Sequence, residues 1–269
     1  MRVILRLIEE RISSRAKSSV MIEMHKLTIE DETVPCQFVL FDLDGTILDD
    51  TVRYRTMARA RFEVIRDAAG VEAAERWAEL SGVDPGDYSV DLMGPLAKAP
   101  RKEDITVGAA ALWPRGYRWY EAMEAARKLY EEADRLQETR YVPILFERVA
   151  EALRALKGAG LMLGIATNGS GEAARGLMAV HGLEGLFEVY VGADMVEEGK
   201  PDPEMIFLSC EMAGVPPAET VYVGDSPADM MAGRSAGCGA VIAVNHLEDG
   251  ELTRLADIVT ESVANFRAS

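Results

Sequence analysis

The sequence predicts an α/β fold: a parallel sheet covered by helices on both faces, with an all-helical second domain inserted after the first strand. Two observations predict it. After residue 36, short continuous apolar runs alternate with longer segments of helical periodicity, a pattern typical of parallel strands buried on both faces. The segment from about residue 54 to 139 departs from this rhythm, because helical periodicity runs through it without a convincing strand.

Each expected strand is a short apolar run, and each helix that follows has a clear start. The expected strands are residues 38–43, 161–166, 187–191, 220–223 and 240–244. Ser170 is placed to cap a helix that ends near Gly182. Asp202–Pro203 and Ser226–Pro227 open two later helices, each with proline at the first helical position. Strands and helices therefore alternate along the chain, as parallel sheets require.

The expected domain boundaries follow from this pattern. Residues 37–53 and 140–269 are assigned to the α/β core, and residues 54–139 to a helical cap domain. One apolar stripe at helical spacing marks the end of the cap and is formed by Trp119, Met123, Ala126, Tyr130 and Ala133.

Residues 1–36 are interpreted as an N-terminal extension that is helical. Ile4, Ile8 and Ile12 fall at helical spacing, and basic residues outnumber glutamates there. Three interpretations are open for this segment: a basic amphipathic helix that binds a membrane or a partner, a peripheral helix without a role in function, and residues upstream of a true start at Met21 or Met24. We favour the last two interpretations.

Composition excludes some classes of function. The chain has 269 residues, 48% of them hydrophobic, which is ample for a buried core. Its formal net charge of −16 argues against a nucleic-acid binder, which needs a basic surface. No run of 18 apolar residues predicts a membrane span. The three cysteines are widely spaced and lack a CxxC pair, which favours inert thiols in the cytoplasm over disulfides or a zinc site. We expect a cytoplasmic monomer or homodimer.

The stretch "FVLFDLDGTILDD" (residues 38–50) places two carboxylates at the end of a buried strand. Asp42 and Asp44 lie two positions apart, so their side chains can face the same way. The carboxyl ends of the strands are where open α/β sheets bind their ligands. Taken alone, the pair is also compatible with a polar strand exit followed by a glycine turn.

Three further segments place polar residues after later strands or before helices. "IATNGS" ends in Thr167 and Asn168 just before a helix N-terminus, where an anion can bind, although this is also common turn chemistry. "EEGKPDP" contains Lys200, which alone reads as a solvated loop lysine. "VYVGDSPADM" contains Asp225 and Asp229, and Asp229 is also placed to complete a helix cap.

Taken together, these segments predict a metal site. Parallel strands bring their carboxyl ends to one edge of the sheet, so Asp42, Asp44, Asp225 and Asp229 are expected to converge there. Clustered carboxylates repel one another unless a cation lies among them, and hard oxygen ligands favour Mg²⁺. Lys200 and Thr167 are then suited to the oxygens of a phosphoryl group.

In this order, the motifs resemble those of the haloacid dehalogenase superfamily, specifically its phosphatases with a helical cap, such as phosphoglycolate phosphatases. The resemblance covers about residues 37 to 267. It implies a Rossmann-like core, a phospho-aspartyl intermediate and a Mg²⁺ cofactor.

The resemblance also implies a role for each matching residue. Asp42 is the expected nucleophile and Asp44 the expected general acid and base. Thr167, Asn168 and Lys200 are expected to bind the phosphoryl group. The expected metal ligands are Asp42, the backbone carbonyl of Asp44, and Asp225, with Asp229 as a ligand or a support through water. Two neighbouring carboxylates with opposite starting protonation states allow one site to perform both acid and base chemistry.

The expected function is hydrolysis of a small phosphorylated metabolite. Family members that cleave carbon–halogen or carbon–phosphorus bonds typically lack an acid at the position of Asp44, so phosphate-ester chemistry is favoured. A phosphosugar mutase of the β-phosphoglucomutase type remains the alternative. A catalytically idle relative that serves as a binding or regulatory module is a second alternative, although no motif residue is missing.

Substrate specificity is expected to depend on the cap. A substrate with a second anionic group needs a cation there, and arginine offers a planar grip on carboxylate or phosphate. The hypothesis is that one or two cap arginines bind the leaving group, and the candidates are Arg53, Arg55, Arg115 and Arg118. The alternative for each is a solvated arginine or an ion pair with one of the many acids.

Overall fold

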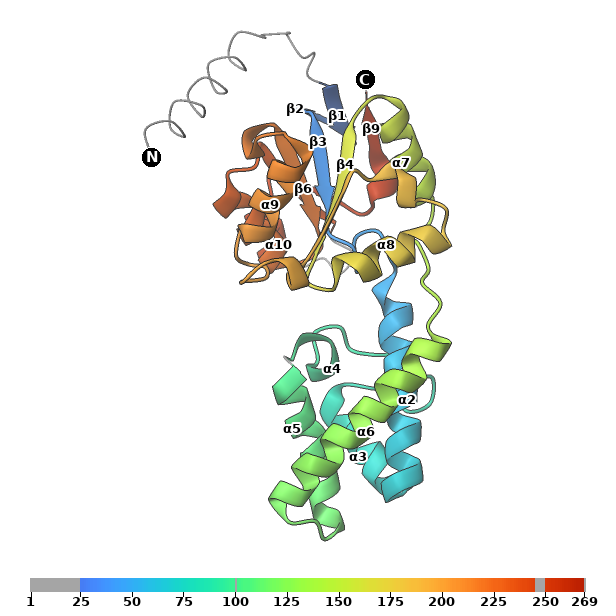
Figure 1. The fold of residues 1–269 in the computed structure, drawn as a ribbon. Coiled ribbons are helices and arrows are strands. Elements are labelled where there is room, and N and C mark those ends of the chain that lie inside the picture. The colour runs from blue at the N-terminus through green and yellow to red at the C-terminus, as the bar shows by residue number, and fades with distance from the viewer. Residues whose placement is uncertain (1–24, 100, 245–249, 269) are drawn as a thin grey trace, which may run out of the picture.

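The computed structural model describes residues 25–99, 101–244 and 250–268, which form an α/β core and a separate helical insert. Figure 1 shows the insert beyond one end of the sheet, reached through two connections that lie side by side. The α/β fold class predicted from the sequence is confirmed.

The core is built on a parallel sheet whose strand order, among the described residues, is β5-β4-β3-β6-β7-β8. Its strands are β3 (Phe38–Phe41), β4 (Met162–Thr167), β5 (Val189–Gly192), β6 (Thr220–Gly224), β7 (Ala240–Val244) and β8 (Ile258–Thr260). Every residue of the central strand β3 is buried, as expected for a strand covered on both faces. The short strand β8 has no counterpart among the expected strands.

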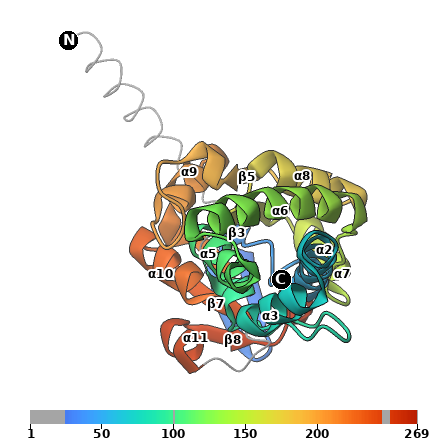
Figure 2. The ribbon, with the colours of Figure 1, turned by 90° about the horizontal axis from the view of Figure 1, so that it is seen from below.

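Helices cover both faces of this sheet. They are α7 (Val149–Gly158), α8 (Gly171–Val180), α9 (Glu204–Ala213), α10 (Pro227–Ala236) and α11 (Gly250–Leu255). Val39 and Phe41 of β3 share a buried cluster with residues of α7 and α8, whereas Phe38 and Leu40 share one with residues of α9, α10 and α11. Figure 2 shows α7 on one side of the sheet and α9 and α10 on the other. The alternation of side chains along β3 thus divides the core into two layers.

Short 3-10 helices complete the connections within the core. They are η2 (Glu184–Leu186), η3 (Ala193–Met195), η4 (Pro217–Glu219) and η5 (Val263–Asn265).

The insert is helical and has its own apolar core. Its helices are α2 (Asp50–Ala69), α3 (Val71–Ser81), α4 (Pro95–Lys98), α5 (Arg101–Leu112), η1 (Trp113–Arg115) and α6 (Trp119–Arg140). The buried cluster includes Trp77 and Tyr130, whose side chains are joined by a 2.8 Å hydrogen bond from indole nitrogen to phenol oxygen. A buried ion pair of 2.7 Å between Arg61 and Asp104 ties α2 to α5. These internal contacts make the insert a packed unit rather than a loop.

The expectation of a helical extension is wrong for residues 25–36. They form a hairpin, β1 (His25–Ile29) and β2 (Glu32–Cys36), and β1 also pairs with β9 (Phe266–Ala268) near the other end of the chain. Alternation explains the difference, because Leu27 and Ile29 are fully buried while their neighbours are not. The earlier part of the expected helical extension, residues 1–24, lies outside the described residues.

None of the helices in the described ranges combines the length and the apolar character needed to cross a bilayer. The long helices α2 and α6 are rich in charged residues along their whole length.

Candidate active site

Three neighbouring strands, β4, β3 and β6, end at the same edge of the sheet and bring the sequence motifs together. Asp42 directly follows β3, Thr167 is the last residue of β4, and Asp225 directly follows β6. The Asp42 backbone N–H donates to the carbonyl of Val223 at 2.8 Å, which fixes the ends of β3 and β6 side by side. The expected convergence of Asp42, Thr167 and Asp225 follows directly from the parallel pairing.

Lys200 lies in the centre of this edge and is buried. Its ammonium group donates to Asp42 Oδ1 at 2.5 Å, to Asp229 Oδ1 at 2.6 Å and to the Ala166 carbonyl at 3.2 Å. Burial lowers the pKa of Lys200, but the charges of Asp229 and Asp42 outweigh it and raise the pKa well above its ordinary value. The lysine is therefore a fixed cation, not the solvated loop residue that it resembles when read alone.

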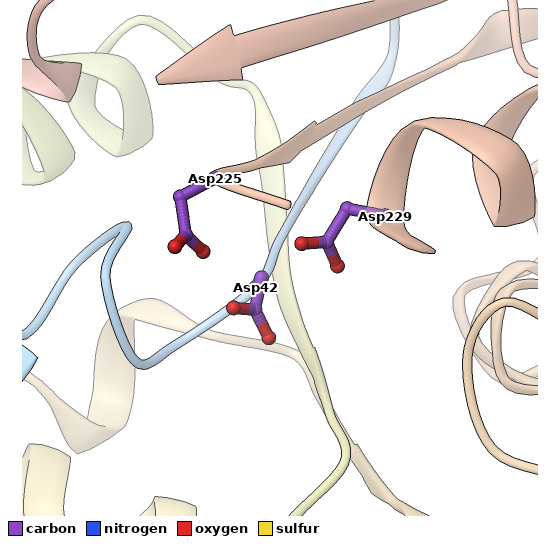
Figure 3. A group of neighbouring side chains, drawn as sticks. All are labelled: Asp42, Asp225 and Asp229. Atoms are coloured by element: carbon purple, nitrogen blue, oxygen red, sulfur yellow. The ribbon is translucent and has the colours of Figure 1, made fainter. Parts of the chain in front are cut away.

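The carboxylates of Asp42, Asp225 and Asp229 form a cluster. One oxygen from each lies within 4.8 Å of the others, and Figure 3 shows the side chains pointing toward one another. Burial raises the pKa of Asp42 to about 7, with Lys200 lowering it and Asp229 raising it. Burial and the charges of Asp42 and Asp229 also raise the pKa of Asp225 well above its usual range.

This cluster fits a divalent cation. The cluster has three carboxylates, and the ammonium of Lys200 pairs with two of them, Asp42 and Asp229, so the negative charge exceeds what that one cation balances. The raised pKa values of Asp42 and Asp225 express the same excess, because ionisation is disfavoured when like charges are buried together. A hard divalent ion with oxygen ligands would offset it, and Mg²⁺ is the ion that this donor set favours.

The carboxylate of Asp229 is fully engaged by protein groups. Its Oδ1 accepts from Lys200 and, at 3.0 Å, from the Tyr222 hydroxyl. Its Oδ2 accepts from the Ser226 backbone N–H at 3.0 Å and from the Ser226 hydroxyl at 2.5 Å. With the return bond from the Asp229 N–H to Ser226 Oγ, this is the capping box at the start of α10. Asp229 thus serves as a helix cap and as a counter-ion for Lys200.

Gly45 permits the close approach of Asp225. Its φ of +78° lies in the left-handed region, and a Cβ placed there would lie 2.3 Å from Asp225 Oδ2. The next residue, Thr46, donates its hydroxyl to Asp225 Oδ1 at 3.4 Å. The glycine of the first motif is therefore needed for the approach of two strand ends as well as for a turn.

Thr167 and Asn168 lie at this edge but have different surroundings. The buried Thr167 side chain accepts from the Gly169 N–H at 3.1 Å. The Asn168 amide binds the backbone of Lys200, accepting from its N–H at 2.9 Å and donating to its carbonyl at 3.3 Å. Both polar ends of Asn168 hold the lysine loop, so its position supports an anchoring role more than the expected direct contact with phosphate.

Asp44 lies on the side of the site that faces the insert. Its Oδ2 accepts from Arg53 NH1 at 2.7 Å, and both side chains are partly exposed. Burial lowers the pKa of Arg53, but Asp44 and the neighbouring Tyr54, Tyr141 and Asp50 together outweigh this and raise it. Among the candidate cap arginines whose side chains the structure describes, Arg53 is therefore the one joined to a motif residue.

The remaining cap arginines are not brought to the site. Arg55 is exposed on α2. The pKa of Asp87, which lies within the insert, is lowered mainly by hydrogen bonds from Ser89 and to a smaller extent by the positive charge of Arg55. Arg115 belongs to η1 and Arg118 is the N-cap residue of α6. Figure 1 places this α5–α6 connection at the end of the insert that is farthest from the core. Since α5 and α6 carry this connection away from the sheet, this arrangement gives no support to a role for Arg115 and Arg118 in binding the leaving group, which stays a prediction.

Two groups of the site were not among the sequence candidates, Tyr222 and Thr46. Both contact cluster carboxylates. Tyr222 had a weak signal, since a phenol within an otherwise apolar buried strand needs a hydrogen-bond partner.

Comparison with known proteins identifies the family. The family model described as haloacid dehalogenase-like hydrolase matches residues 37–237. The chain belongs to this family. The first motif lies within the matched region, as do Lys200 and the Asp225–Asp229 segment.

Several curated relatives of this family member have similar sequences. Hexitol phosphatase A of Escherichia coli (strain K12) is 30% identical over 233 residues, which cover 85% of this chain and 92% of the relative. A phosphoglycolate phosphatase of Chromobacterium violaceum is 30% identical over 228 residues, covering 85% of this chain and 93% of the relative.

Solved structures show the same fold. The crystal structure of a putative beta-phosphoglucomutase from Thermotoga maritima matches with a TM-score of 0.62 at 24% identity, covering 85% of this chain and 95% of that one. A haloacid dehalogenase superfamily hydrolase from Geobacter sulfurreducens, of subfamily IA, matches with a TM-score of 0.58 at 25% identity, covering 85% and 93%. Both structures thus share the fold of this chain over most of its length.

Proposed function

We propose that this family member is a Mg²⁺-dependent phosphomonoester hydrolase that acts on a small phosphorylated metabolite through a phospho-aspartyl intermediate. The observation that carries the proposal is the buried ammonium of Lys200, held between Asp42 and Asp229 at the edge where β3, β4 and β6 end. A nucleophilic carboxylate, a fixed cation and a cluster suited to a divalent ion are the components that phosphoryl transfer requires.

Asp42 is the proposed nucleophile. Its carboxylate directly follows β3, a strand that is buried at every residue, so the backbone that carries it is rigid. Lys200 donates to one oxygen of Asp42, which orients the carboxylate and leaves the other oxygen for in-line attack on phosphorus. The lysine also offsets negative charge on the transferring group, and Thr167 at the end of β4 offers a hydroxyl to the phosphoryl oxygens.

Asp44 is the proposed general acid and base. It would protonate the leaving oxygen when Asp42 attacks, and then accept a proton from the water that hydrolyses the aspartyl phosphate. Its position on the side of the insert suits this role, because the leaving group must lie on the side of the transferring phosphorus away from Asp42.

Mg²⁺ would be held by Asp42, Asp225 and the backbone carbonyl of Asp44. Asp229 would act indirectly, by holding the ammonium of Lys200 in place. When bound, the ion supplies charge stabilisation for the phosphoryl oxygens. The engagement of both Asp229 oxygens by protein groups supports the indirect role for that residue.

The substrate is proposed to be a small phosphate ester. The curated relatives are named phosphoglycolate phosphatase and hexitol phosphatase, names that indicate small substrates. Hydrolysis is proposed over the mutase reaction because the similar sequences at 30% identity carry phosphatase names. The cytoplasm is the proposed location, in keeping with the free thiols of Cys36, Cys210 and Cys238.

A phosphate-release screen over small phosphometabolites tests this function. With Mg²⁺ present, we expect at least one sugar phosphate or phospho-acid to be hydrolysed, with free alcohol and phosphate in equal amounts. Release of an isomeric sugar phosphate without free phosphate would instead indicate a mutase.

Metal removal is expected to abolish activity. EDTA should stop phosphate release and added Mg²⁺ should restore it, because the excess negative charge of the cluster otherwise opposes ionisation of Asp42. Asp225→Ala is expected to raise the Mg²⁺ concentration for half-maximal activity by at least about tenfold. The control is Asp194→Ala, whose exposed carboxylate lies beyond β5 and contacts α8 instead of the cluster. Full activity of the wild-type protein in chelator would contradict the metal role.

A further inference from the structure

The ion pair between Arg53 and Asp44 crosses the boundary between the insert and the core. Arg53 lies in the first turn of α2, and Asp44 lies in the loop after β3. The NH1 to Oδ2 distance is 2.7 Å, and the side chains are 38% and 30% exposed. An ion pair this exposed contributes little to stability, so stability alone is a weak reason for its presence.

The pair lies at the point where both connections to the insert meet, which we call the junction (residues 44–53 and 141–146). The Asp49 N–H donates to the Ile144 carbonyl at 2.8 Å, and the Phe146 N–H donates to the Ile47 carbonyl at 3.1 Å. The two connections therefore run antiparallel against each other. These hydrogen bonds hold the segment that joins Asp44 to the first turn of α2.

Tyr141 adds a buried polar group to the junction. It caps the end of α6 where the chain returns to the core. Its hydroxyl is buried and has no hydrogen-bond partner among the described residues. Burial raises the pKa of Tyr141 to about 12, with a further contribution from Asp44 and an opposing one from Arg53. The charges of both Asp44 and Arg53 therefore affect the pKa of this phenol.

The geometry leaves Arg53 poorly placed to bind a substrate anion directly. Its guanidinium already donates to Asp44, whereas Lys200 supplies the cation for the phosphoryl group. Asp44, in turn, has one oxygen held by Arg53 and must present the other to the leaving group. An unrestrained carboxylate at a partly exposed position would rotate among several orientations.

We propose that Arg53 is a positioning residue for Asp44. By holding Oδ2, it orients Oδ1 toward the oxygen that leaves phosphorus, and it links the placement of the acid to the first helix of the insert. The inference rests on the proposed phosphatase function. It replaces the hypothesis that Arg53 binds the substrate.

The test compares leaving groups within each protein sample. The variants are Arg53→Met, Arg53→Lys and the matched control Arg59→Met, whose arginine lies on the same helix and pairs with Glu63. The substrates are p-nitrophenyl phosphate, whose leaving group needs no proton, and an alkyl phosphate that the wild-type protein hydrolyses. The ratio of the two kcat values does not depend on how much of a sample is folded.

We expect Arg53→Met to lower kcat for the alkyl phosphate about tenfold more than for p-nitrophenyl phosphate, part of the 10²- to 10⁴-fold effect of a general acid. KM should change little. Arg53→Lys should recover part of the loss, and Arg59→Met should match the wild-type protein. In an Asp44→Asn background, Arg53→Met should have no further effect on this ratio, because the group that it positions is already absent.

Two results would overturn the inference. An equal loss from Arg53→Met with and without Asp44 would show that Arg53 acts independently of the acid. A raised KM confined to substrates with a second anionic group, also seen in the Asp44→Asn background, would make Arg53 a substrate-binding residue after all. Failure of the proposed function is a separate result, since the wild-type protein would then release phosphate from neither ester.

Discussion

Replacing Asp42 with Asn is expected to lower phosphate release by at least about 10⁴-fold, the scale of loss when a catalytic nucleophile is removed. An amide cannot attack phosphorus to form an acyl phosphate. The fold should persist, because Asn has nearly the same volume and its carbonyl can still accept a hydrogen bond from Lys200. Lys200 also keeps its ion pair with Asp229. Steady-state phosphate release and thermal unfolding of the same sample measure both expectations.

The control for this substitution is Asp194→Asn, which removes a carboxylate beyond β5 at the same edge of the sheet. Asp194 is exposed and holds the start of α8 through Ser170 and Gly171, away from Lys200. Its activity should remain near that of the wild-type protein. Substantial phosphate release by a pure Asp42→Asn sample would remove the nucleophile from the mechanism.

Asp44→Asn is expected to have the second-largest effect, and its size should depend on the leaving group. With alkyl phosphates, whose leaving oxygen needs a proton, the loss should be about 10²- to 10⁴-fold. With p-nitrophenyl phosphate the loss should be smaller, because p-nitrophenolate leaves without one. The loss that remains with p-nitrophenyl phosphate comes from the role of Asp44 as a base in hydrolysis of the aspartyl phosphate, a step that both substrates share.

The kcat values of wild type and Asp44→Asn over a series of leaving groups measure this dependence. The slope against leaving-group pKa should be steeper in the variant. If alkyl and p-nitrophenyl phosphates lose the same fraction of activity, Asp44 does not donate the proton.

The core and the convergence of the motifs could be predicted because local patterns and parallel pairing determine them. Apolar runs locate β3, β4 and β6, and neighbouring parallel strands bring Asp42, Thr167 and Asp225 to one edge. The capping box of Ser226 and Asp229 is equally local, since it spans a single helical turn.

Contacts between distant segments could not be predicted in the same way. The strand β1 pairs with β9, which lies near the opposite end of the chain, and nothing local to residues 25–29 indicates that partner. The alternation of Leu27 and Ile29 is typical of a strand, whereas the helical spacing of the isoleucines that precede it predicts a helix.

The directions of helices within the insert were also beyond the sequence pattern. The sequence alone does not distinguish Arg53 from Arg118 as a substrate-binding residue. Only the path of the chain shows that α2 begins at the junction, whereas α6 begins far from the core. Likewise, the burial of Lys200 between two carboxylates depends on three separate segments and has no local signal.

A covalent intermediate on Asp42 is the central claim, and chemical trapping tests it most directly. The wild-type protein is mixed with Mg²⁺ and a substrate, quenched during turnover and treated with borohydride, which reduces an aspartyl phosphate to homoserine but leaves a free aspartate unchanged. Peptide mass spectrometry then locates the reduced residue, with Asp42→Asn as the negative control. The account predicts homoserine at position 42 alone. Rapid phosphate release with no reduced residue at position 42, or with reduction at another aspartate, would contradict it.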